Sequence, residues 1–440
     1  MSTGGLEPAA AACLFPPLGA LVDGAGGVVL FARDIRSPEQ LAELTASLPG
    51  LLIAVDEEGG DVTRLEAATG SSFPGNLALG AVNDEALTRR VGAAIGGELA
   101  AAGVNFDLAP VADVIVDPAN PIVGVRSFGS DPALVSRHVA AFVEGLQSVG
   151  VAACAKHFPG HGESLADSHL ELPSVETDRE TLFARALPPF AAAVEVGVRG
   201  VMTAHIRFAA LDDRAATVSA EVIGLLRSEL GFEGLVITDA LEMRAISGTV
   251  GLEEGAVRTL AAGADALCLG ADVTREQVQA VQAAIVHGVP EERLREAAAR
   301  VAETGAWASS PRPHHDLEAG AEAARRALRV EGDVSLNGEP LVVELRPKAT
   351  IAAGEARHGL GGTLVREGEQ LPPLDDLSRV VIVVRDAHRH AWQRDLVPAR
   401  TLVVETGVPE WRPPDARGWI ATYGAGRVNL EAAAELIAHG

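Results

Sequence analysis

Residues 156–173, KHFPGHGESLADSHLELP, bring many titratable side chains into one short segment. The first fourteen of them include three histidines, one lysine and two acids, together with three residues that are glycine or proline. Lysine is rare elsewhere, because Lys156 and Lys348 are the only lysines in a chain with 36 basic residues. Histidine titrates near neutral pH, and lysine offers a compact charge with several hydrogen-bond donors. We therefore expect this segment to bind polar groups and to transfer protons.

Several short apolar runs of the chain also end in polar residues. The residues that end four of these runs are Asp56, Lys156 with His157, His205 and Asp239. In a barrel of parallel strands the carboxyl ends of the strands form one face, and active sites are built there. Any strand must end in something polar, which explains one or two of these cases but not all four. We therefore expect these residues to converge on one site.

The elements that must position these residues follow a β–α rhythm. The β-rich runs are residues 26–31, 51–56, 104–111, 151–156, 200–205, 234–239 and 265–270. Alanine-rich amphipathic stretches between them predict helices, for example at 131–150, with Asp131 as N-cap, Pro132 at the first helical position and Gly150 as the stop. Seven or eight such units with continuous apolar strands predict a (β/α)8-like TIM barrel. Residues 11–19 offer one further strand, but the segment after it is too short for a full helix, so the barrel should open irregularly.

The composition changes near Trp307. All eleven phenylalanines lie at or before Phe232, whereas the four tryptophans and the single tyrosine lie at or after Trp307. The proline- and serine-bearing stretch WASSPRPHHDLEAG also breaks the helix pattern there. We predict a barrel domain at 1–305, a linker at 306–320 and a smaller C-terminal α/β domain at 321–440. The runs that support the second domain are PLVVEL, RVVIVV, TLVVET, GWIATYG and the helix candidate NLEAAAELIAHG. Its polar stretch at 385–395 is interpreted as a surface helix and an inter-domain contact.

Charge and composition exclude several classes of partner. The chain is 48% hydrophobic and 22% charged, with a net charge of −24 and a pI of about 4.9. Nucleic acids and anionic membranes require a cationic surface, so neither is expected as a partner. The three cysteines are far apart and lack metal-ligand spacing, which predicts free thiols in a reducing compartment. The N-terminus lacks a basic segment typical of a signal peptide, and no apolar run is long enough to span a membrane. We expect a cytoplasmic protein.

The segment KHFPGHG followed by DSH resembles the signature of bacterial glycoside hydrolase family 3 β-N-acetylglucosaminidases. Similar segments occur in the family's order from about residue 26 to about residue 270, and the C-terminal domain is similar to the second domain of two-domain members. The resemblance implies a catalytic barrel, a retaining and exo-acting β-N-acetylglucosaminidase, and no metal or cofactor. Related β-glucosidases and β-xylosidases typically lack this loop, which favours N-acetylglucosamine as the sugar. The supporting segments are GGVVLFARDI, IAVDEEGGDVTRL, NFDLAPVADV, GVRSFGSDP, VMTAHI and GFEGLVITDALEM.

Asp239 is the candidate nucleophile. It ends the apolar run in LVITDAL, and a carboxylate held at a strand end can attack an anomeric carbon to form a glycosyl-enzyme. The alternative is a helix N-cap, because ALEMRAI could begin a helix after it. The resemblance implies the nucleophile's role at this position.

His169 is the candidate acid/base, with Asp167 as its partner. Retaining glycosidases usually use a second carboxylate, but a histidine can also protonate the leaving oxygen and later activate water. Asp167 would orient the ring and stabilise its protonated form, as the acid does in a Ser-His-Asp triad. The resemblance carries this dyad onto the two residues. The alternative is that Asp-Ser-His is simply a polar turn.

The resemblance also places Lys156, His157, Asp56, Arg64 and Arg126 around the terminal sugar. Asp56 can accept from two hydroxyls at once, and the arginines can donate to hydroxyls or to the acetamido carbonyl. Each arginine could instead form a surface ion pair, as is common in so acidic a chain.

Two further histidines have less specific roles. His161 is expected to bond within the loop and to be structural. His205 either lines the pocket or is a satisfied histidine at the edge of the core.

The barrel half contains no tryptophan or tyrosine, which fits a small pocket for one terminal sugar and so exo-action. Small glycosides such as peptidoglycan fragments are the family's typical substrates, and chitin fragments are a second option.

Three alternatives stay open. A phosphorylase could use the same residues, because a histidine acid/base would not repel phosphate. A metal-dependent amidohydrolase would need an HxH pair in the barrel, but the only one lies at 388–390. The last is a non-catalytic sugar-binding protein.

Overall fold

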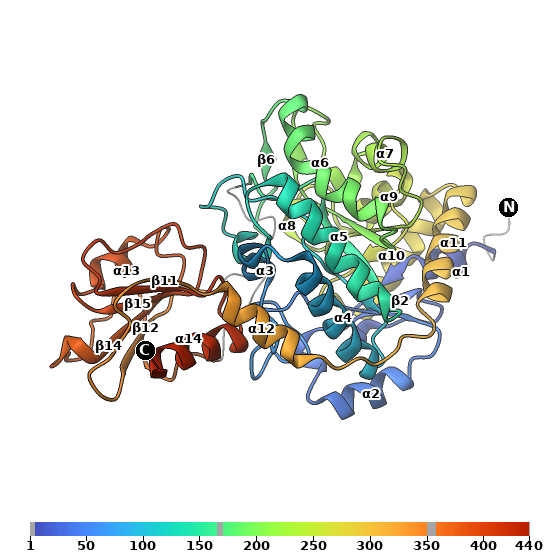
Figure 1. Cartoon of the computed structure of the whole chain (residues 1–440). Coiled ribbons are helices and arrows are strands. Elements are labelled where there is room, and N and C mark those ends of the chain that lie inside the picture. The colour runs from blue at the N-terminus through green and yellow to red at the C-terminus, as the bar shows by residue number, and fades with distance from the viewer. Residues whose placement is uncertain (1–4, 165–169, 350–357, 440) are drawn as a thin grey trace.

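The structure is a computed structural model that describes residues 5–164, 170–349 and 358–439. Figure 1 shows a larger lobe built from the N-terminal part of the chain and a smaller lobe, in orange and red, built from the C-terminal part. The helices on either side of the expected linker are α11 (Glu291–Trp307) and α12 (Leu317–Ala327). The exact domain boundaries at 305 and 320 stay a prediction.

The larger lobe contains a six-stranded parallel sheet. Its strands in spatial order are β2 (Gly27–Val29), β3 (Leu52–Val55), β4 (Phe106–Asp107), β5 (Ala152–Phe158), β7 (Gly200–Thr203) and β9 (Leu235–Thr238). A second parallel pair is formed by β1 (Leu14–Phe15) and β10 (Leu267–Cys268). The bridges that join this pair to the two edges of the sheet are Ile237–Ala266 and Pro17–Val29. The strands therefore close into a ring, and the predicted (β/α)8-like barrel fold is confirmed.

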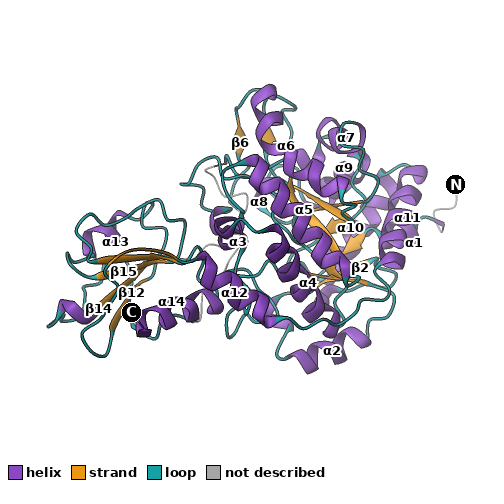
Figure 2. Ribbon diagram, viewed as in Figure 1, coloured by secondary structure: helices purple, strands orange, loops and turns teal. Residues whose placement is uncertain are grey.

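Helices surround these strands in Figure 2. The longer ones are α11, already named, and α2 (Pro38–Ala46), α4 (Glu85–Ala101), α5 (Pro132–Ser148), α6 (Arg179–Glu195), α7 (Ala220–Ser228), α9 (Leu252–Ala262) and α10 (Arg275–Gly288). Helix α5 begins as predicted, because the Asp131 carboxylate accepts from the amide of Ala133 at 3.0 Å and Pro132 is the first helical residue. The barrel also opens irregularly as expected, since only a 3-10 turn (Leu18–Ala20) follows β1.

Short elements complete the barrel lobe. They are α1 (Glu7–Ala12), α3 (Asn76–Val82), α8 (Arg244–Ser247), and the parallel pair β6 (Ser174–Val175) and β8 (Arg207–Phe208).

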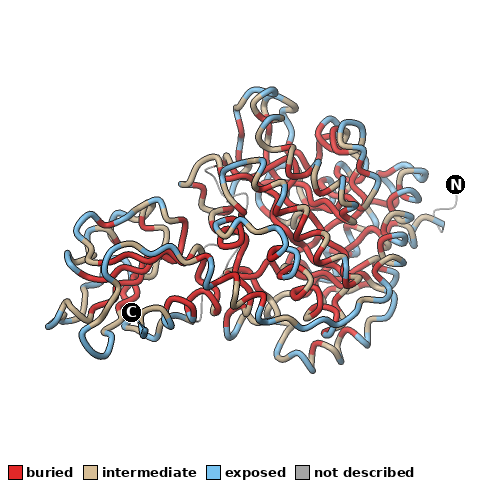
Figure 3. The backbone as a smooth tube through the Cα atoms, in the orientation of Figure 1, coloured by how far each residue is buried: buried red, intermediate tan, exposed pale blue. Residues whose placement is uncertain are grey.

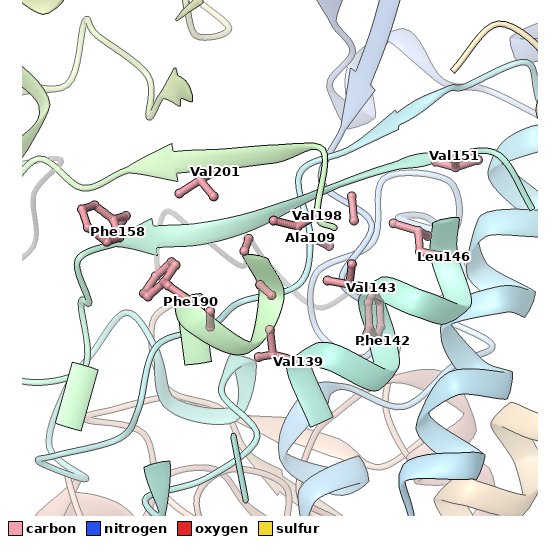
Figure 4. Close-up of a cluster of buried hydrophobic side chains, with 14 of the residues drawn as sticks. Ala109, Val139, Phe142, Val143, Leu146, Val151, Phe158, Phe190, Val198 and Val201 are labelled. Atoms are coloured by element: carbon pink, nitrogen blue, oxygen red, sulfur yellow. The ribbon is translucent and has the colours of Figure 1, made fainter. Parts of the chain in front are cut away.

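The core that holds β5 in place lies between the strands and the surrounding helices. Figure 3 shows the buried residues following the strands and the inner faces of the helices. In Figure 4, Phe158 at the end of β5 faces Phe190 of α6, with ring centroids 5.2 Å apart at 87°. Both are fully buried, and each such side chain contributes about 1.5–3 kcal/mol on burial. This packing fixes the strand end that precedes the histidine-rich segment.

The smaller lobe is an α/β domain with one six-stranded sheet. Its strands in spatial order are β11 (Arg329–Gly332), β16 (Gly418–Ala421), β15 (Leu402–Glu405), β14 (Val380–Val384), β12 (Leu341–Leu345) and β13 (Thr363–Val365). Only the β11–β16 pair is antiparallel. The domain's other helices are α13 (Ala391–Leu396) and α14 (Arg427–His439). The four predicted strands and the C-terminal helix are confirmed, whereas β11 and β13 were not predicted.

The cysteines Cys13, Cys154 and Cys268 are buried free thiols, as expected. Among the residues that the structure describes, every helix is too short or too polar to cross a membrane.

Candidate active site

A cavity of about 360 Å³ lies at the carboxyl ends of the barrel strands. The residues named in the sequence analysis that line it are Asp56, Arg64, Arg126, Lys156, His157, His161 and Asp239. They come from four separate strand ends and loops, so the barrel brings together residues that are far apart in the chain. This is the face on which barrel enzymes build their active sites.

Lys156 is the centre of a buried charge network. Its Nζ lies 2.6 Å from Asp56 Oδ1 and 2.7 Å from Glu58 Oε1, and its side chain is 1% exposed. Burial opposes the charge of Lys156, but Asp56 and Glu58 outweigh that effect and raise its pKa. The lysine is therefore a permanent cation held between two carboxylates, with a fixed position at the floor of the cavity.

Glu58 also holds Arg126. Its two carboxylate oxygens accept from Arg126 Nε at 2.9 Å and from Nη2 at 2.7 Å. Burial would raise the pKa of Glu58, yet Arg126 and Lys156 outweigh it and lower the pKa to about 2. A two-point arginine–carboxylate pair fixes the plane of the guanidinium. Glu58 thereby sets the positions of both cations.

Asp56 lies between Lys156 and Arg64. Its Oδ2 is 3.5 Å from Arg64 Nη2, and its side chain is 23% exposed, so one edge of the carboxylate faces the cavity. Burial would raise the pKa of Asp56, but Lys156 and Arg64 hold it well below its usual range. Asp56 is thus an ionised hydrogen-bond acceptor at the edge of the cavity.

His157 is oriented by a buried aspartate. Its Nδ1 lies 2.8 Å from Asp113 Oδ2, while Asp113 Oδ1 accepts from the backbone amides of His157 at 3.2 Å and of His161 at 2.7 Å. The bond to Asp113 places a proton on Nδ1 of His157. Nε2 is the ring nitrogen that does not take part in this bond. Asp113 thus fixes both the ring and the start of the loop.

His161 is packed within the loop, as expected. It is 2% exposed, and its ring meets that of His157 edge-on at 5.7 Å between centroids. Burial, together with His157, lowers the pKa of His161 to about 4.

Asp239 directly follows β9 and lines the same cavity. Its amide donates to the carbonyl of Thr203 at 3.2 Å, and its Oδ1 accepts from the amide of Ala240 at 2.8 Å. The next helix, α8, begins only at Arg244 and has Met243 at its N-cap position. Asp239 is therefore not the N-cap of a helix, and its carboxylate faces the cavity from a strand end.

His205 does not line the cavity. It is fully buried, with Nδ1 2.7 Å from Thr217 Oγ1 and Nε2 3.0 Å from the carbonyl oxygen of Ala240. Of the two options that the sequence left open, this geometry favours a satisfied histidine at the edge of the core. Its bond to Ala240 supports the backbone next to Asp239.

The predicted dyad, Asp167 and His169, lies outside the described residues. The residues just before the dyad are held in place, because the side-chain amide of Asn120 donates to the carbonyls of His161 at 2.8 Å and of Ser164 at 2.7 Å.

Sequence reasoning missed four acids of the site: Glu57, Glu58, Asp107 and Asp113. Asp107 ends β4 and the other three follow strand ends, all within the motifs that carry the family resemblance, DEEGG and FDLAPVADV. Their place at or just after the predicted strand ends was the signal from which they could have been identified. Their roles depend on partners that come from other strands.

Glu57 and Asp107 form a layer behind the cavity. The amide of Glu57 donates to Asp107 Oδ1 at 3.0 Å, and Glu57 Oε2 accepts from the amides of Arg64 and Leu65 at 2.8 and 3.0 Å. Burial raises the pKa of Glu57 to about 7 and raises that of Asp107 well above its usual value. Within the described ranges, no group of three or more His, Cys, Asp or Glu side chains is arranged to hold a metal ion.

Comparisons with known proteins agree with this geometry. Residues 22–304 match the family model described as the glycosyl hydrolase family 3 N terminal domain. A β-hexosaminidase from Nitrosomonas eutropha is 36% identical over 271 residues, which cover 58% of this chain and 77% of that protein. One from Alkalilimnicola ehrlichii is 42% identical over 257 residues, covering 56% and 73%. The chain spans only 45% of the length of β-hexosaminidase A from Pseudoalteromonas piscicida, at 37% identity.

Solved structures match over the whole chain. A glycoside hydrolase family 3 β-N-acetylglucosaminidase from Paenibacillus sp. str. FPU-7 has a TM-score of 0.86 at 30% identity, covering 99% of this chain and 96% of that one. A β-glucoside phosphorylase has a TM-score of 0.79 at 21% identity, which shows a shared fold alone. The chain therefore belongs to glycosyl hydrolase family 3. The family and the enzyme class predicted from the sequence, a glycoside hydrolase, are confirmed, and the similarity is to the β-hexosaminidases of that family.

Proposed function

We propose that this protein is a retaining, exo-acting β-N-acetylglucosaminidase that removes terminal β-linked N-acetylglucosamine from small glycosides. The observation that carries the proposal is the cavity itself, which has a volume of about 360 Å³ and is lined by Asp239 together with the fixed network of Asp56, Lys156 and Arg126. That volume is at the lower end of the range for small-molecule sites. It suits one terminal sugar better than a polysaccharide chain.

The first half of the reaction forms a covalent sugar–enzyme bond. A carboxylate oxygen of Asp239 attacks the anomeric carbon while the bond to the leaving oxygen breaks. His169 donates its proton to that oxygen, and Asp167 stabilises the protonated ring beforehand. The product of this half is a glycosyl ester of Asp239 and a free alcohol.

The second half releases the sugar with its original anomeric configuration. His169, now neutral, accepts a proton from water as the water oxygen attacks the anomeric carbon. The ester bond breaks and Asp239 leaves as a carboxylate. Two inversions at the same carbon give net retention.

The sugar is held by the network that lines the cavity together with Asp239. Asp56 accepts from hydroxyls, while Lys156, Arg64, Arg126 and His157 donate to hydroxyls or to the acetamido carbonyl. Because Glu58 and Asp113 fix these donors before the sugar arrives, little rearrangement is needed on binding.

Relatives and the loop signature support the choice of sugar. The curated relatives carry the name β-hexosaminidase, and the Paenibacillus structure is that of a β-N-acetylglucosaminidase. Peptidoglycan-derived muropeptide fragments are the proposed substrates, with chitin fragments as the second option. A role in peptidoglycan recycling in the cytoplasm is part of this proposal.

Charge around the cavity favours water over phosphate as the acceptor. Of the described residues that line the cavity, the cations Arg64, Arg126 and Lys156 each pair with Asp56 or Glu58 on the sugar-binding side. The lining also includes the acids Glu242 and Asp272, of which Asp272 forms an ion pair with Arg33. An incoming phosphate would meet the carboxylate of Glu242, so hydrolysis is favoured over phosphorolysis.

The test compares release of p-nitrophenol from its β-N-acetylglucosaminide and from its β-glucoside. We expect turnover of the first only, abolished by Asp239→Asn, strongly reduced by His169→Ala, and unchanged by Asp213→Asn, a surface control. Repeating the assay in phosphate buffer, with detection of sugar 1-phosphate, separates hydrolase from phosphorylase. Equal turnover by Asp239→Asn and wild type, or sugar 1-phosphate as the main product, would refute the proposal.

A further inference from the structure

A tight turn connects two parts of the sugar-binding network. The amide of Glu58 donates to the carbonyl of Val62 at 3.0 Å, and the amide of Val62 donates to the carbonyl of Gly59 at 3.2 Å. Gly59 and Gly60 have φ values of 77° and 59°, a backbone conformation that glycine adopts readily. We call residues 58–62 the β3 turn. Asp56 and Glu58 lie on its incoming side and Arg64 follows it, so a shift of the turn moves the side chains that hold the sugar.

The tip of the β3 turn is held by the C-terminal domain. Asp61 Oδ1 accepts from the amide of Ala425 at 2.7 Å, and Asp61 Oδ2 forms an ion pair with the guanidinium of Arg385. The Asp61 side chain is 4% exposed and that of Arg385 is 25% exposed. Arg385 directly follows β14, and Ala425 lies between β16 and α14. Two elements of the second domain therefore converge on one carboxylate of the barrel domain.

The backbones of the two domains also meet at this point. A Cβ atom added at Gly426 would lie 2.9 Å from the Cα of Gly60, closer than such atoms normally approach. The contact therefore requires glycine at 426, and the turn has no room to move toward the C-terminal domain.

A second contact joins the domains close by, through the residues that directly follow Gly426. Arg427 pairs with Glu66 at 3.1 Å and donates to Ser72, and the amide of Val428 donates to the carbonyl of Ser71 at 3.2 Å. This contact lies beyond the β3 turn in the chain and does not involve Asp61. It supplies a matched control, because removing Arg427 weakens the same interface without touching the turn.

We propose that the C-terminal domain positions the sugar-binding site through Arg385, which holds the β3 turn at Asp61. The side chains of Glu58, Lys156 and Arg126 thereby keep their positions relative to one another. Without Arg385, Asp61 would be a buried carboxylate with a weakened set of partners, and a buried charge lacking its partner is strongly unfavourable. The turn would relax toward solvent, and Glu58, three residues earlier, would move with it. Arg385 is a positioning residue, since it does not line the cavity. This inference rests on the proposed function, because the activity readout uses the same substrate.

The test compares Arg385→Ala, Arg385→Lys and Arg427→Ala in the full-length protein. For Arg385→Ala we expect kcat/KM on the p-nitrophenyl β-N-acetylglucosaminide to fall about tenfold, mainly through KM, because the network binds the sugar in the ground state and the transition state alike. Arg385→Lys should recover part of the loss. Arg427→Ala should lower Tm by a similar amount but leave kcat/KM within twofold of wild type.

Hydrogen exchange gives a readout that does not depend on activity. Amides in the peptide covering residues 56–66 should exchange faster in Arg385→Ala than in Arg427→Ala. Gly426→Ala, which presses on Gly60 without removing a charge, should also raise KM. Wild-type KM and wild-type exchange in Arg385→Ala would overturn the inference. So would a loss of kcat/KM that is proportional to the fall in Tm in both Arg385→Ala and Arg427→Ala. Absence of turnover by the wild type would instead refute the proposed function, while the exchange comparison would still decide the role of Arg385.

Discussion

At the scale of single residues, the charge balance of the cavity depends on Lys156. It is the only described side chain that pairs with both Asp56 and Glu58, and it is almost completely buried. The sequence pointed to this lysine because lysine is rare in the chain. The sequence could not show Glu58 as its partner, because an acid that follows a strand-end Asp has no distinguishing pattern until β5 and the loop that bears Arg126 are brought beside it.

The two lysines of the chain allow a matched experiment. Lys156→Met should destabilise the protein by about 3–5 kcal/mol, because it leaves two carboxylates without their shared cation. It should also abolish measurable sugar binding. Lys348→Met changes an exposed side chain of the second domain and should alter stability by less than about 0.5 kcal/mol. Thermal unfolding with and without N-acetylglucosamine measures both effects, and equal Tm values for the two variants would contradict this account of the network.

Glu57 gives the site a defined dependence on pH. Burial raises the pKa of Glu57 from 4.5 to about 7 in the folded protein. The unfolded carboxyl ionises near 4.5, so this group's contribution to stability is fully present below that pH and is lost as the pH rises through 7. At about 1.4 kcal/mol for each pKa unit, the loss is roughly 3 kcal/mol.

Glu57→Gln removes this titration while keeping a side-chain oxygen for the amides of Arg64 and Leu65. The fall in Tm between pH 5 and pH 8 should therefore be smaller in Glu57→Gln than in wild type. Glu303→Gln, at an exposed position, should behave like wild type. An unchanged fall in Tm for Glu57→Gln would show that Glu57 is already ionised at pH 5.

At the scale of elements, the loop after β5 depends on a close approach to the segment after β4. A Cβ atom added at Gly162 would lie 1.6 Å from the carbonyl oxygen of Val114, so any larger residue must displace one of the two backbones. Gly162→Ala should cost about 1–3 kcal/mol of stability. It should also lower kcat/KM, because the same loop continues to Asp167 and His169. Gly224 in α7 has open space around it, and Gly224→Ala should leave both quantities unchanged or slightly raise stability. Wild-type activity in Gly162→Ala would mean that the loop tolerates displacement.

The sequence predicted elements well where a buried apolar run made the strand obvious. All the predicted barrel strands are present, because each is a run that is covered on both faces. Strands β11 and β13 were not predicted, because they lie at the edges of the second sheet and are mostly exposed, with polar sequences such as RVEG. The N-cap at Asp131 was predictable because its signals lie within a few residues of one another.

At the scale of the whole molecule, the net charge of −24 sets the response to salt. Repulsion among like charges destabilises a compact state, and ions screen it over a Debye length of about 10 Å at 0.1 M. We expect Tm at pH 8 to rise when sodium chloride is increased from about 0.02 to about 0.2 M. A fall in Tm over this range would show that the surface ion pairs outweigh the net repulsion.

Contacts between the domains were only partly foreseeable. The polar stretch at 385–395 was interpreted as an inter-domain contact, and this is confirmed by Arg385 on Asp61 and by His388, whose Nε2 donates to the carbonyl of Pro118 at 2.8 Å. Nothing in the sequence could match Arg385 to Asp61, because 324 positions separate them and each lies in a segment of mixed charge. Long-range pairs of this kind become visible only once both folds are placed together.

The central claim is that Asp239 forms a covalent bond to the sugar, and trapping that bond tests it most directly. The protein would be incubated with a 5-fluoro β-N-acetylglucosaminyl fluoride, whose glycosyl-enzyme hydrolyses slowly, and then digested for mass spectrometry. We predict one added sugar per chain on the peptide that contains Asp239, and none on Asp239→Asn. A label on another carboxylate, or turnover of the substrate with inversion at the anomeric carbon, would contradict the account.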